Sequence, residues 1–325
     1  MGAYRKTVMT CVMAAALVLF SYNFSFAQNE SIKGVQFKDG STIYGIIVEM
    51  DANKVVIATK NNESVTRKYD DIASFLKDDD INKSKHSLSF GTEISYIKYE
   101  EPGFMEEKGE LYGLVFSYAY HDKLMAKLDG KFAYGEIDYD GGTWGGDPLT
   151  VKRIPDFLME IRALLGYDFV IKNALTITPY SGVGYRYLQD NMQDKYSGGY
   201  QRESNYIYLP AGVETVARLG SGWSLGAAAE FDIFLWGRQI SYFSDIDSYY
   251  WETENEQMKG YGARGSAFIA KKGNKYGFMI EPYIRYWNIK ESRQGYIVYG
   301  GYLVGYGIEP DNNSTEIGCK LAVTF

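Results

Sequence analysis

The sequence has little of the chemistry from which metal and enzyme sites are usually built. Its 325 residues include two histidines, two cysteines and only seven prolines. No cluster of His or Cys has the spacing of a metal site, and the Asp-rich segments lack the regular spacing of a calcium loop. We therefore expect neither a metal nor a cofactor.

Long hydrophobic runs are also scarce, and the one that stands out is Val12 to Phe20 (VMAAALVLF). Basic residues precede it, and SFA at 25–27 places small residues at the two positions that a signal peptidase reads. The run is too short to span a bilayer comfortably. We expect residues 1–27 to be a secretory signal peptide cleaved after Ala27. Cys319 is then the single cysteine of the exported chain, which excludes an intramolecular disulfide.

Positive charge is not in excess, because 34 Lys and Arg face 41 Asp and Glu, a net charge of −7. An acidic exported chain is not a nucleic-acid binder. What is abundant is Tyr (30), Phe (17), Trp (5) and Gly (35). Aromatic residues and glycine in alternating segments favour β-structure with rings at membrane interfaces over a helical enzyme.

Residues 31–77 are predicted to form a small β-module. Asp39-Gly40 supplies the tight turn of a hairpin, because glycine accepts the positive φ that such a turn needs. Further short strands are expected at 54–59 and 64–69, followed by one helical turn and a closing strand at 73–76. This meander is similar to SH3-like or Sm-like barrels. The resemblance implies a periplasmic module without chemistry of its own, and docking on a periplasmic partner is the alternative.

Residues 78–86 are predicted to be a charged, solvated linker, and residues 87–325 have a different pattern. Apolar residues alternate with polar or small ones in successive segments, and no helical period appears. Apolar rows of this kind include Leu88, Phe90, Ile94 and Tyr96; Tyr112, Leu114, Phe116, Tyr118 and Tyr120; and Leu225, Ala227, Ala229, Phe231, Ile233 and Leu235. A soluble sandwich also alternates, but with its apolar face inward.

The connections between these segments favour a membrane barrel. Short turns are expected near 121–123, 170–174, 219–222 and 272–274. They alternate with longer polar loops, expected at 100–110, 140–153, 189–203, 239–258 and 291–313. Alternating short and long connections are typical of outer-membrane barrels, whose short turns lie in the periplasm. The predicted fold class is all-β: a ten-stranded antiparallel transmembrane β-barrel over 87–325, with both of its ends on the periplasmic side, preceded by the small SH3-like module.

Two motifs carry a resemblance to a family. EIGCKLAVTF at 316–325 resembles the β-signal read by the barrel-assembly machinery, and PYSGVGYRY at 179–187 resembles a strand that recurs in small outer-membrane barrels. The signal residues are Ile317, Cys319, Leu321, Val323 and Phe325. The chain therefore resembles the porin-like and OmpA-like barrels of Gram-negative bacteria. This implies location in the outer membrane among lipid and lipopolysaccharide, and insertion by the assembly machinery.

Residue parity assigns many charged side chains to the barrel interior, since Arg or Lys facing mid-bilayer lipid costs about 2–4 kcal/mol. They are Glu93, Lys131, Glu160, Arg162, Arg186, Glu214, Arg218, Glu230, Asp232, Arg264, Glu281, Arg285, Glu316 and Lys320. We expect Asp232, Arg264, Arg285 and Glu316 at similar heights, and Glu93 to meet Lys320 at the seam. One hypothesis is a paired network that fills the lumen. The other is a constriction that selects small polar solutes.

An enzyme is the less favoured alternative. Omptin-like proteases and barrel lipases use a His at the outer rim, because a base with a pKa near neutrality suits their chemistry. Here His86 and His121 fall at the periplasmic end of the predicted barrel. The carboxylate pairs Glu230/Asp232 and Asp245/Asp247 are explained by lumen pairing and loop solvation. We therefore expect a non-enzymatic barrel with a structural or surface-interaction role, with a narrow channel and an omptin-like hydrolase as the alternatives.

The last two outer loops are rich in aromatic residues: Tyr242, Phe243, Tyr249, Tyr250, Trp251, Tyr296, Tyr299, Tyr302 and Tyr306. Exposed rings of this kind could bind a glycan, a host surface or a partner protein. Packing of the loops against one another is the interpretation favoured by the sequence.

Overall fold

The computed structural model describes residues 32–77 and 85–325, except 60, 62, 144, 172, 173 and 274. The predicted signal peptide and its cleavage site lie outside the described residues, as does most of the 78–86 linker. The chain divides into two units, Met1–Lys83 and Ser84–Phe325. None of the helical segments in the described part has the length and apolar character needed to cross a membrane.

The first unit contains two three-stranded antiparallel sheets, ordered β2-β1-β6 and β3-β4-β5. The elements are β1 (Ile32–Phe37), β2 (Thr42–Tyr44), β3 (Ile46–Met50), β4 (Lys54–Ala58), β5 (Ser64–Lys68), the 3-10 turn η1 (Tyr69–Asp71) and β6 (Ile72–Lys77). Gly40 takes φ +85° in the β1–β2 hairpin, as the Asp-Gly turn requires. Val35, Phe37, Val55 and Ile57 form a small buried core. These two small sheets do not support the predicted SH3-like or Sm-like fold.

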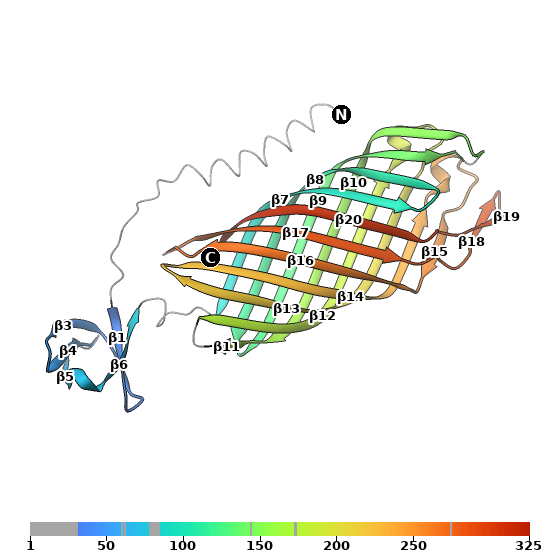
Figure 1. The fold of residues 1–325 in the computed structure, drawn as a ribbon. Coiled ribbons are helices and arrows are strands. Elements are labelled where there is room, and N and C mark those ends of the chain that lie inside the picture. The colour runs from blue at the N-terminus through green and yellow to red at the C-terminus, as the bar shows by residue number, and fades with distance from the viewer. Residues whose placement is uncertain are drawn as a thin grey trace. The chain divides into compact units, whose positions relative to one another are not determined.

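The second unit is a closed antiparallel β-barrel of ten strands, which confirms the predicted fold class (Figure 1). Its strands are β7 (His86–Glu101), β8 (Met105–Asp122), β9 (Leu124–Gly142), β10 (Pro148–Tyr167), β12 (Leu175–Asn191), β13 (Gln201–Gly220), β14 (Trp223–Ser241), β16 (Gly260–Lys271), β17 (Gly277–Ile289) and β20 (Asn312–Thr324). Neighbours in sequence pair around the ring. The first and last strands close it, because β7 pairs with β20 along twelve residue pairs.

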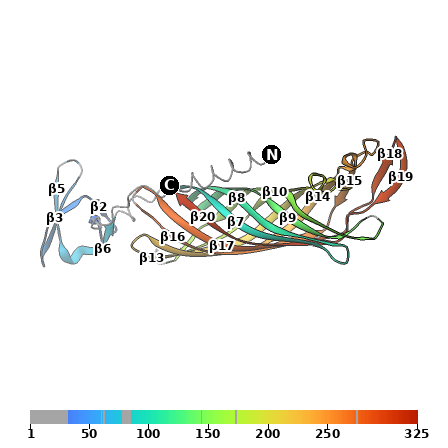
Figure 2. The ribbon, with the colours of Figure 1, turned by 90° about the horizontal axis from the view of Figure 1, so that it is seen from above.

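One end of the barrel carries Phe325 and the short turns, and we call it the turn end. The other, the loop end, carries β15 (Thr253–Gln257), β18 (Gly295–Tyr299) and β19 (Tyr302–Gly307), which extend beyond the ring in both views (Figures 1 and 2). Short 3-10 turns η2 (Met192–Asp194) and η3 (Phe243–Asp245) also lie in the connections of the loop end. Strand β11 (Phe169–Ile171) pairs with β12 at the turn end. Lys123 and Ser221 adopt positive φ in two tight turns there.

The outer surface of the barrel carries a belt of exposed apolar side chains. It includes Leu88, Phe90, Ile94, Leu114, Phe132, Ile161, Val183, Val213, Phe231, Ile233, Ile280, Ile284, Ile317 and Leu321. Tyr96, Tyr112 and Tyr134 border the belt toward the loop end, whereas Tyr118, Tyr167 and Tyr276 border it toward the turn end. The interleaved residues point inward and are mostly polar. This is the inverted arrangement of a barrel in lipid, with aromatic girdles at the two interfaces.

The first two outer loops were predicted too long. Strands β7 and β8 run on to Glu101 and Met105, so only a tight turn separates them, and β9 and β10 likewise extend to 142 and 148. The charged residues above the belt explain the difference. Lys98 pairs with Glu100 on its own strand and with Glu106 on β8, at 2.8 Å each, so a cross-strand ion pair continues the contacts beyond the apolar rows.

The belt can be tested with Leu114→Arg, in the middle of the apolar row of β8. If this face contacts hydrocarbon, the free energy of unfolding should fall by about 2–4 kcal/mol, because the cation loses its hydration. The measurement is chemical denaturation of protein refolded into lipid vesicles.

Lys108→Arg is the matched control, since Lys108 lies on the same strand above the belt and is already charged. It should leave stability unchanged. Equal stability of Leu114→Arg and the control would show that the belt does not face lipid.

Candidate functional site

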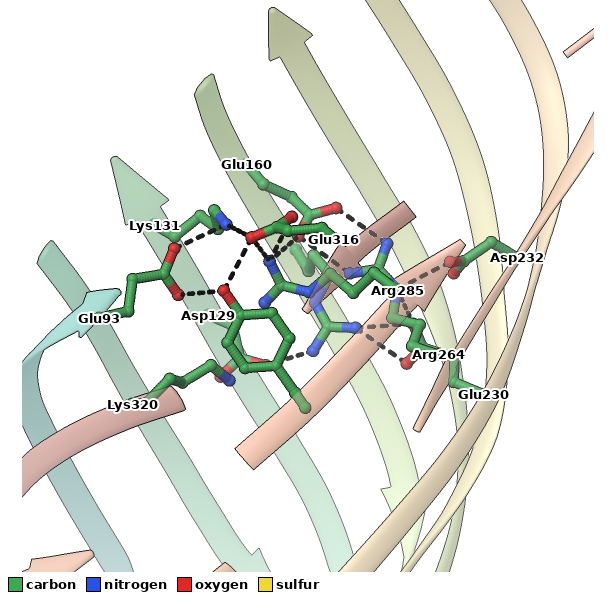
Figure 3. Close-up of polar contacts among 12 residues, drawn as sticks. Glu93, Asp129, Lys131, Glu160, Glu230, Asp232, Arg264, Arg285, Glu316 and Lys320 are labelled. Carbon is green, nitrogen blue, oxygen red and sulfur yellow. Dashed lines mark hydrogen bonds and ion pairs between the residues drawn. The ribbon is translucent and has the colours of Figure 1, made fainter. Parts of the chain in front are cut away.

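Charged side chains from seven of the ten strands meet inside the barrel (Figure 3). We call this group the central network, and it comprises Glu93, Asp129, Lys131, Glu160, Arg162, Glu230, Asp232, Arg264, Arg285 and Glu316, with the hydroxyls of Tyr208 and Tyr283. Parity puts them there, because alternate residues of each strand face inward. Asp232 has no exposed surface at all. Charges so buried are stable only when they are paired and hydrogen-bonded.

Arg264 of β16 is the most connected cation of the central network. Its two terminal nitrogens donate to both carboxylate oxygens of Glu160, at 2.9 and 2.8 Å. Its Nε lies 2.7 Å from Asp232 and 2.8 Å from Glu230. Tyr208 donates to Glu160 at 2.7 Å and accepts from Arg264 at 2.9 Å. This planar fork of donors suits guanidinium and could not be reproduced by lysine.

Two further groups extend the central network across the lumen. Arg162 bridges Glu230 at 2.7 Å and Asp129 at 2.8 Å, which joins β10 to β14 and β9. Lys131 pairs with Glu93 at 2.6 Å and with Glu316. Arg162 and Asp129 are ladder partners on neighbouring strands. The other contacts connect strands that are not neighbours in the ring, so they reach across the lumen.

A second set of ion pairs lies toward the turn end. Lys127 pairs with Glu214 at 3.3 Å, and Lys320 pairs with Glu281 at 3.1 Å. These side chains and part of the central network line a cavity of about 190 Å³. Its wall is mixed, since Met125 and Phe268 also contribute.

Some residues assigned to the interior have other partners or positions than predicted. Lys320 and Glu93 are partners in the strand ladder, but Lys320 bonds to Glu281, and Glu93 bonds to Lys131. Arg186 is buried with its guanidinium 5.7 Å from the ring centre of Trp287, a cation–π contact. Arg218 is exposed at the end of β13.

An aromatic layer covers the central network on the side of the loop end. Tyr206, Tyr208, Phe234 and Trp287 pack together with Ile289, and Trp287 meets Tyr208 edge to face at 5.0 Å. Arg264 lies below this layer, 5.8 Å from the Trp287 ring centre. The layer covers the network with apolar surface on this side, which strengthens the ion pairs next to it.

Above the aromatic layer lies a second charged group that sequence analysis missed. Arg202 binds Glu101 at 3.1 Å, Glu107 at 3.0 Å and Asp190 at 3.1 Å. We define the outer acidic cluster as Glu101, Glu107, Asp156, Asp190 and Glu309, all buried. The alternation of inward and outward side chains continues along the strands beyond the belt, so residue parity could have assigned these positions to the interior. The group was missed because most of these positions were assigned to loops or their edges.

Both histidines lie at the turn end. His121 Nδ1 is 2.8 Å from Asp168, which accepts a second hydrogen bond from Thr178 at 2.6 Å. His86 Nδ1 is 2.7 Å from the Tyr118 hydroxyl. Among the described residues, no group of three or more His, Cys, Asp or Glu is placed to hold a metal ion.

The aromatic residues of the loop end divide into two groups. Phe243 is buried against Tyr200 at 4.8 Å, and Tyr250 packs on Tyr299 at 4.8 Å, which is the packing expected from the sequence. By contrast, Tyr302 is 79% exposed at the tip of the β18–β19 hairpin. Other exposed rings at this end are Tyr249, Trp251, Tyr296 and Tyr306.

No protein-family model and no curated protein sequence matches the chain. Among solved structures, the fold is similar to that of the outer membrane protease OmpT from Escherichia coli. The TM-score is 0.51 at 6% identity, over 74% of this chain and 95% of that chain.

Two other outer-membrane barrels match with lower scores. They are the toluene transporter TodX of P. putida (TM-score 0.30, 12% identity, 75% and 90% of the two chains) and Ail, the attachment invasion locus protein of Yersinia pestis (0.26, 9%, 74% and 99%). At such identities the likeness is one of fold alone. The barrel fold of this chain thus matches that of outer-membrane proteins.

Arg264→Met tests whether the central network stabilises the barrel. Removing this cation leaves Glu160, Glu230 and Asp232 without a shared partner. The free energy of unfolding should therefore fall by about 3–5 kcal/mol, as for other broken buried ion pairs. Denaturation in detergent micelles or vesicles gives the value.

Arg153→Met is the control, because Arg153 is exposed and pairs with Glu136 at 2.8 Å on the outer surface. A surface pair is worth about 0–1 kcal/mol. Similar losses in the two variants would mean that the central network has no structural role.

Proposed function

We propose that this chain is a non-enzymatic integral outer-membrane protein, with a structural or surface-interaction role, whose lumen is sealed by the central network. The proposal rests on ion pairs that connect strands on different sides of the lumen. Arg162 and Lys131 each bond to strands on other sides of the ring, and the aromatic layer closes the space above them. The apolar belt supports placement in a bilayer, with lipid and lipopolysaccharide as its surroundings.

A narrow porin-like channel is the alternative, and one observation favours it. The cavity of about 190 Å³ on the turn side of the network is lined by both signs of charge, as a path for small polar solutes would be. A ten-stranded barrel is also intermediate in width between the filled eight-stranded barrels and the open sixteen-stranded porins. The network, however, separates this cavity from the space near the loop end.

A hydrolase is supported less. The likeness to OmpT is at 6% identity and carries no activity to this chain. Both histidines lie at the turn end, whereas a hydrolase of external substrates needs its base at the loop end. The exposed rings of the β18–β19 hairpin support a surface-interaction role at the loop end.

Two further parts of the proposal concern partners. The terminal residues Ile317, Cys319, Leu321, Val323 and Phe325 would be read by the barrel-assembly machinery during insertion. The module of residues 31–77 would face the periplasm, where an envelope partner could bind it. Pull-down with the full chain should recover a periplasmic protein that is lost when residues 31–77 are deleted.

Planar-bilayer recording separates a sealed barrel from a channel. The wild-type protein should give no defined conductance steps. The double variant Glu160→Ser, Arg264→Ser removes one matched pair of opposite charges and opens the cross-section, so steps should appear. Glu136→Ser with Arg153→Ser removes a matched pair from the outer surface and should stay silent. Regular steps from the wild-type protein would establish the channel instead.

A further inference from the structure

The outer acidic cluster contains more negative charge than the surrounding cations balance. Its five buried carboxylates face two guanidinium groups, Arg202 and Arg186. The other titratable groups packed around it are Tyr99, which donates to Glu101 and Glu309 at 3.1 Å each, and Tyr200. In a water-poor interior such an excess is unfavourable, because repulsion between like charges is weakly screened there.

A proton accounts for part of the excess. Glu309 lies in the connection between β19 and β20, outside the strands, and burial together with the neighbouring Glu101 carboxylate raises its pKa to about 8. Glu309 is therefore mostly protonated at neutral pH. Glu101, Glu107, Asp156 and Asp190 still outnumber the two arginines that face them.

Three carboxylate oxygens of the cluster point to where a counter-ion would lie. Glu107 Oε1, Asp156 Oδ1 and Asp190 Oδ1 are buried and have no hydrogen-bond partner among the described residues. Asp156 is 6% exposed. All three side chains line one small cavity of about 30 Å³, together with Tyr99, Arg202 and Ser204. The wall also includes the apolar Ile97, Ile137 and Leu188, so these oxygens are the strongest acceptors that face the cavity.

Asp156 and Asp190 form the core of this arrangement. They are direct partners in the ladder between β10 and β12, so both side chains project inward from adjacent strands. Arg202 engages only one oxygen of Asp190 and one of Glu107, which leaves the second oxygen of each directed to other ligands.

We propose that a small divalent cation, of the Ca²⁺ or Mg²⁺ type, binds in this cavity between Asp156 and Asp190, with Glu107 as a third, more distant carboxylate. Carboxylate oxygens are the ligands that these hard cations prefer. The described side chains do not form a preformed cage of three ligands. Water therefore completes the coordination, as both ions accept. One such ion offsets the excess of carboxylates over arginines and ties β10 to β12 beneath the outer loops.

The test is titration calorimetry of Ca²⁺ and, separately, Mg²⁺ into the full-length, EDTA-treated protein in detergent at pH 7. Wild-type protein should bind at least one of the two ions at a single saturable site, and its unfolding temperature should rise with the ion. Asp156→Asn and Asp190→Asn should each weaken binding roughly 10- to 100-fold, the range seen when a group that supports a metal site is removed. Circular dichroism establishes that each variant is folded.

Asp311→Asn is the control, because Asp311 is an exposed carboxylate at the same end, paired with Lys290 at 2.9 Å. It should bind the ion as the wild-type protein does. The proposal is overturned if the wild-type protein shows no saturable binding, or if both cluster variants bind like the control. Protonation of the carboxylates, rather than a bound cation, would then balance the negative charge of the cluster. In that case lowering the pH from 8 to 5 alone should raise the unfolding temperature, since a carboxyl group with a raised pKa stabilises the fold at lower pH.

Discussion

The interior of this barrel depends on one constraint: a charge removed from water must meet opposite charge and hydrogen-bond donors. A barrel in lipid cannot turn its ionic residues outward, so they converge in the lumen. Here Arg264 satisfies Glu160, Glu230 and Asp232 at once. Because the partners come from different strands, electrostatic pairing also holds the wall together across its width.

The lumen is consequently layered. A mixed cavity lies toward the turn end, the central network follows, and the aromatic layer around Trp287 separates it from the outer acidic cluster. Each layer changes the electrostatic environment of the next. The aromatic layer lowers the local dielectric constant for the ion pairs below it. It also isolates the cluster around Arg202, whose charge must be balanced locally. If the barrel is sealed as proposed, its contacts with other molecules would lie at its two ends.

The fold class could be predicted because its signals are local. Three features can be recognised from residues that are close together in the sequence. They are apolar alternation, short turns such as the one at Lys123, and aromatic residues at the ends of the apolar rows. The extent of the strands was harder to predict. Glu100 and Glu106 fall in the predicted loop 100–110, yet both lie in strands, and Glu106 pairs across the sheet with Lys98.

Which charged residues meet could be predicted only in part. Asp232, Arg264, Arg285 and Glu316 lie together as expected, with Arg264 paired to Asp232 and Arg285 paired to Glu316. Lys320 and Glu93 are ladder partners, but a long side chain in a narrow lumen can reach several strands, and Lys320 pairs with Glu281 instead. The pair Arg162–Glu230 is separated by 68 positions, and its contact depends on how the closed ring staggers its strands. The outer acidic cluster was missed for a related reason, because Glu101, Glu107 and Asp190 lie where loops were expected.

The central claim is that apolar side chains of the barrel face lipid while their neighbours face inward, and Cys319 provides a direct test. It lies in the alternating apolar row of β20 between Ile317 and Leu321, both exposed. A nitroxide label on Cys319, in protein refolded into lipid vesicles, should collide readily with oxygen and hardly with a water-soluble nickel complex. Ready access of the nickel complex and exclusion of oxygen at this position would contradict the account.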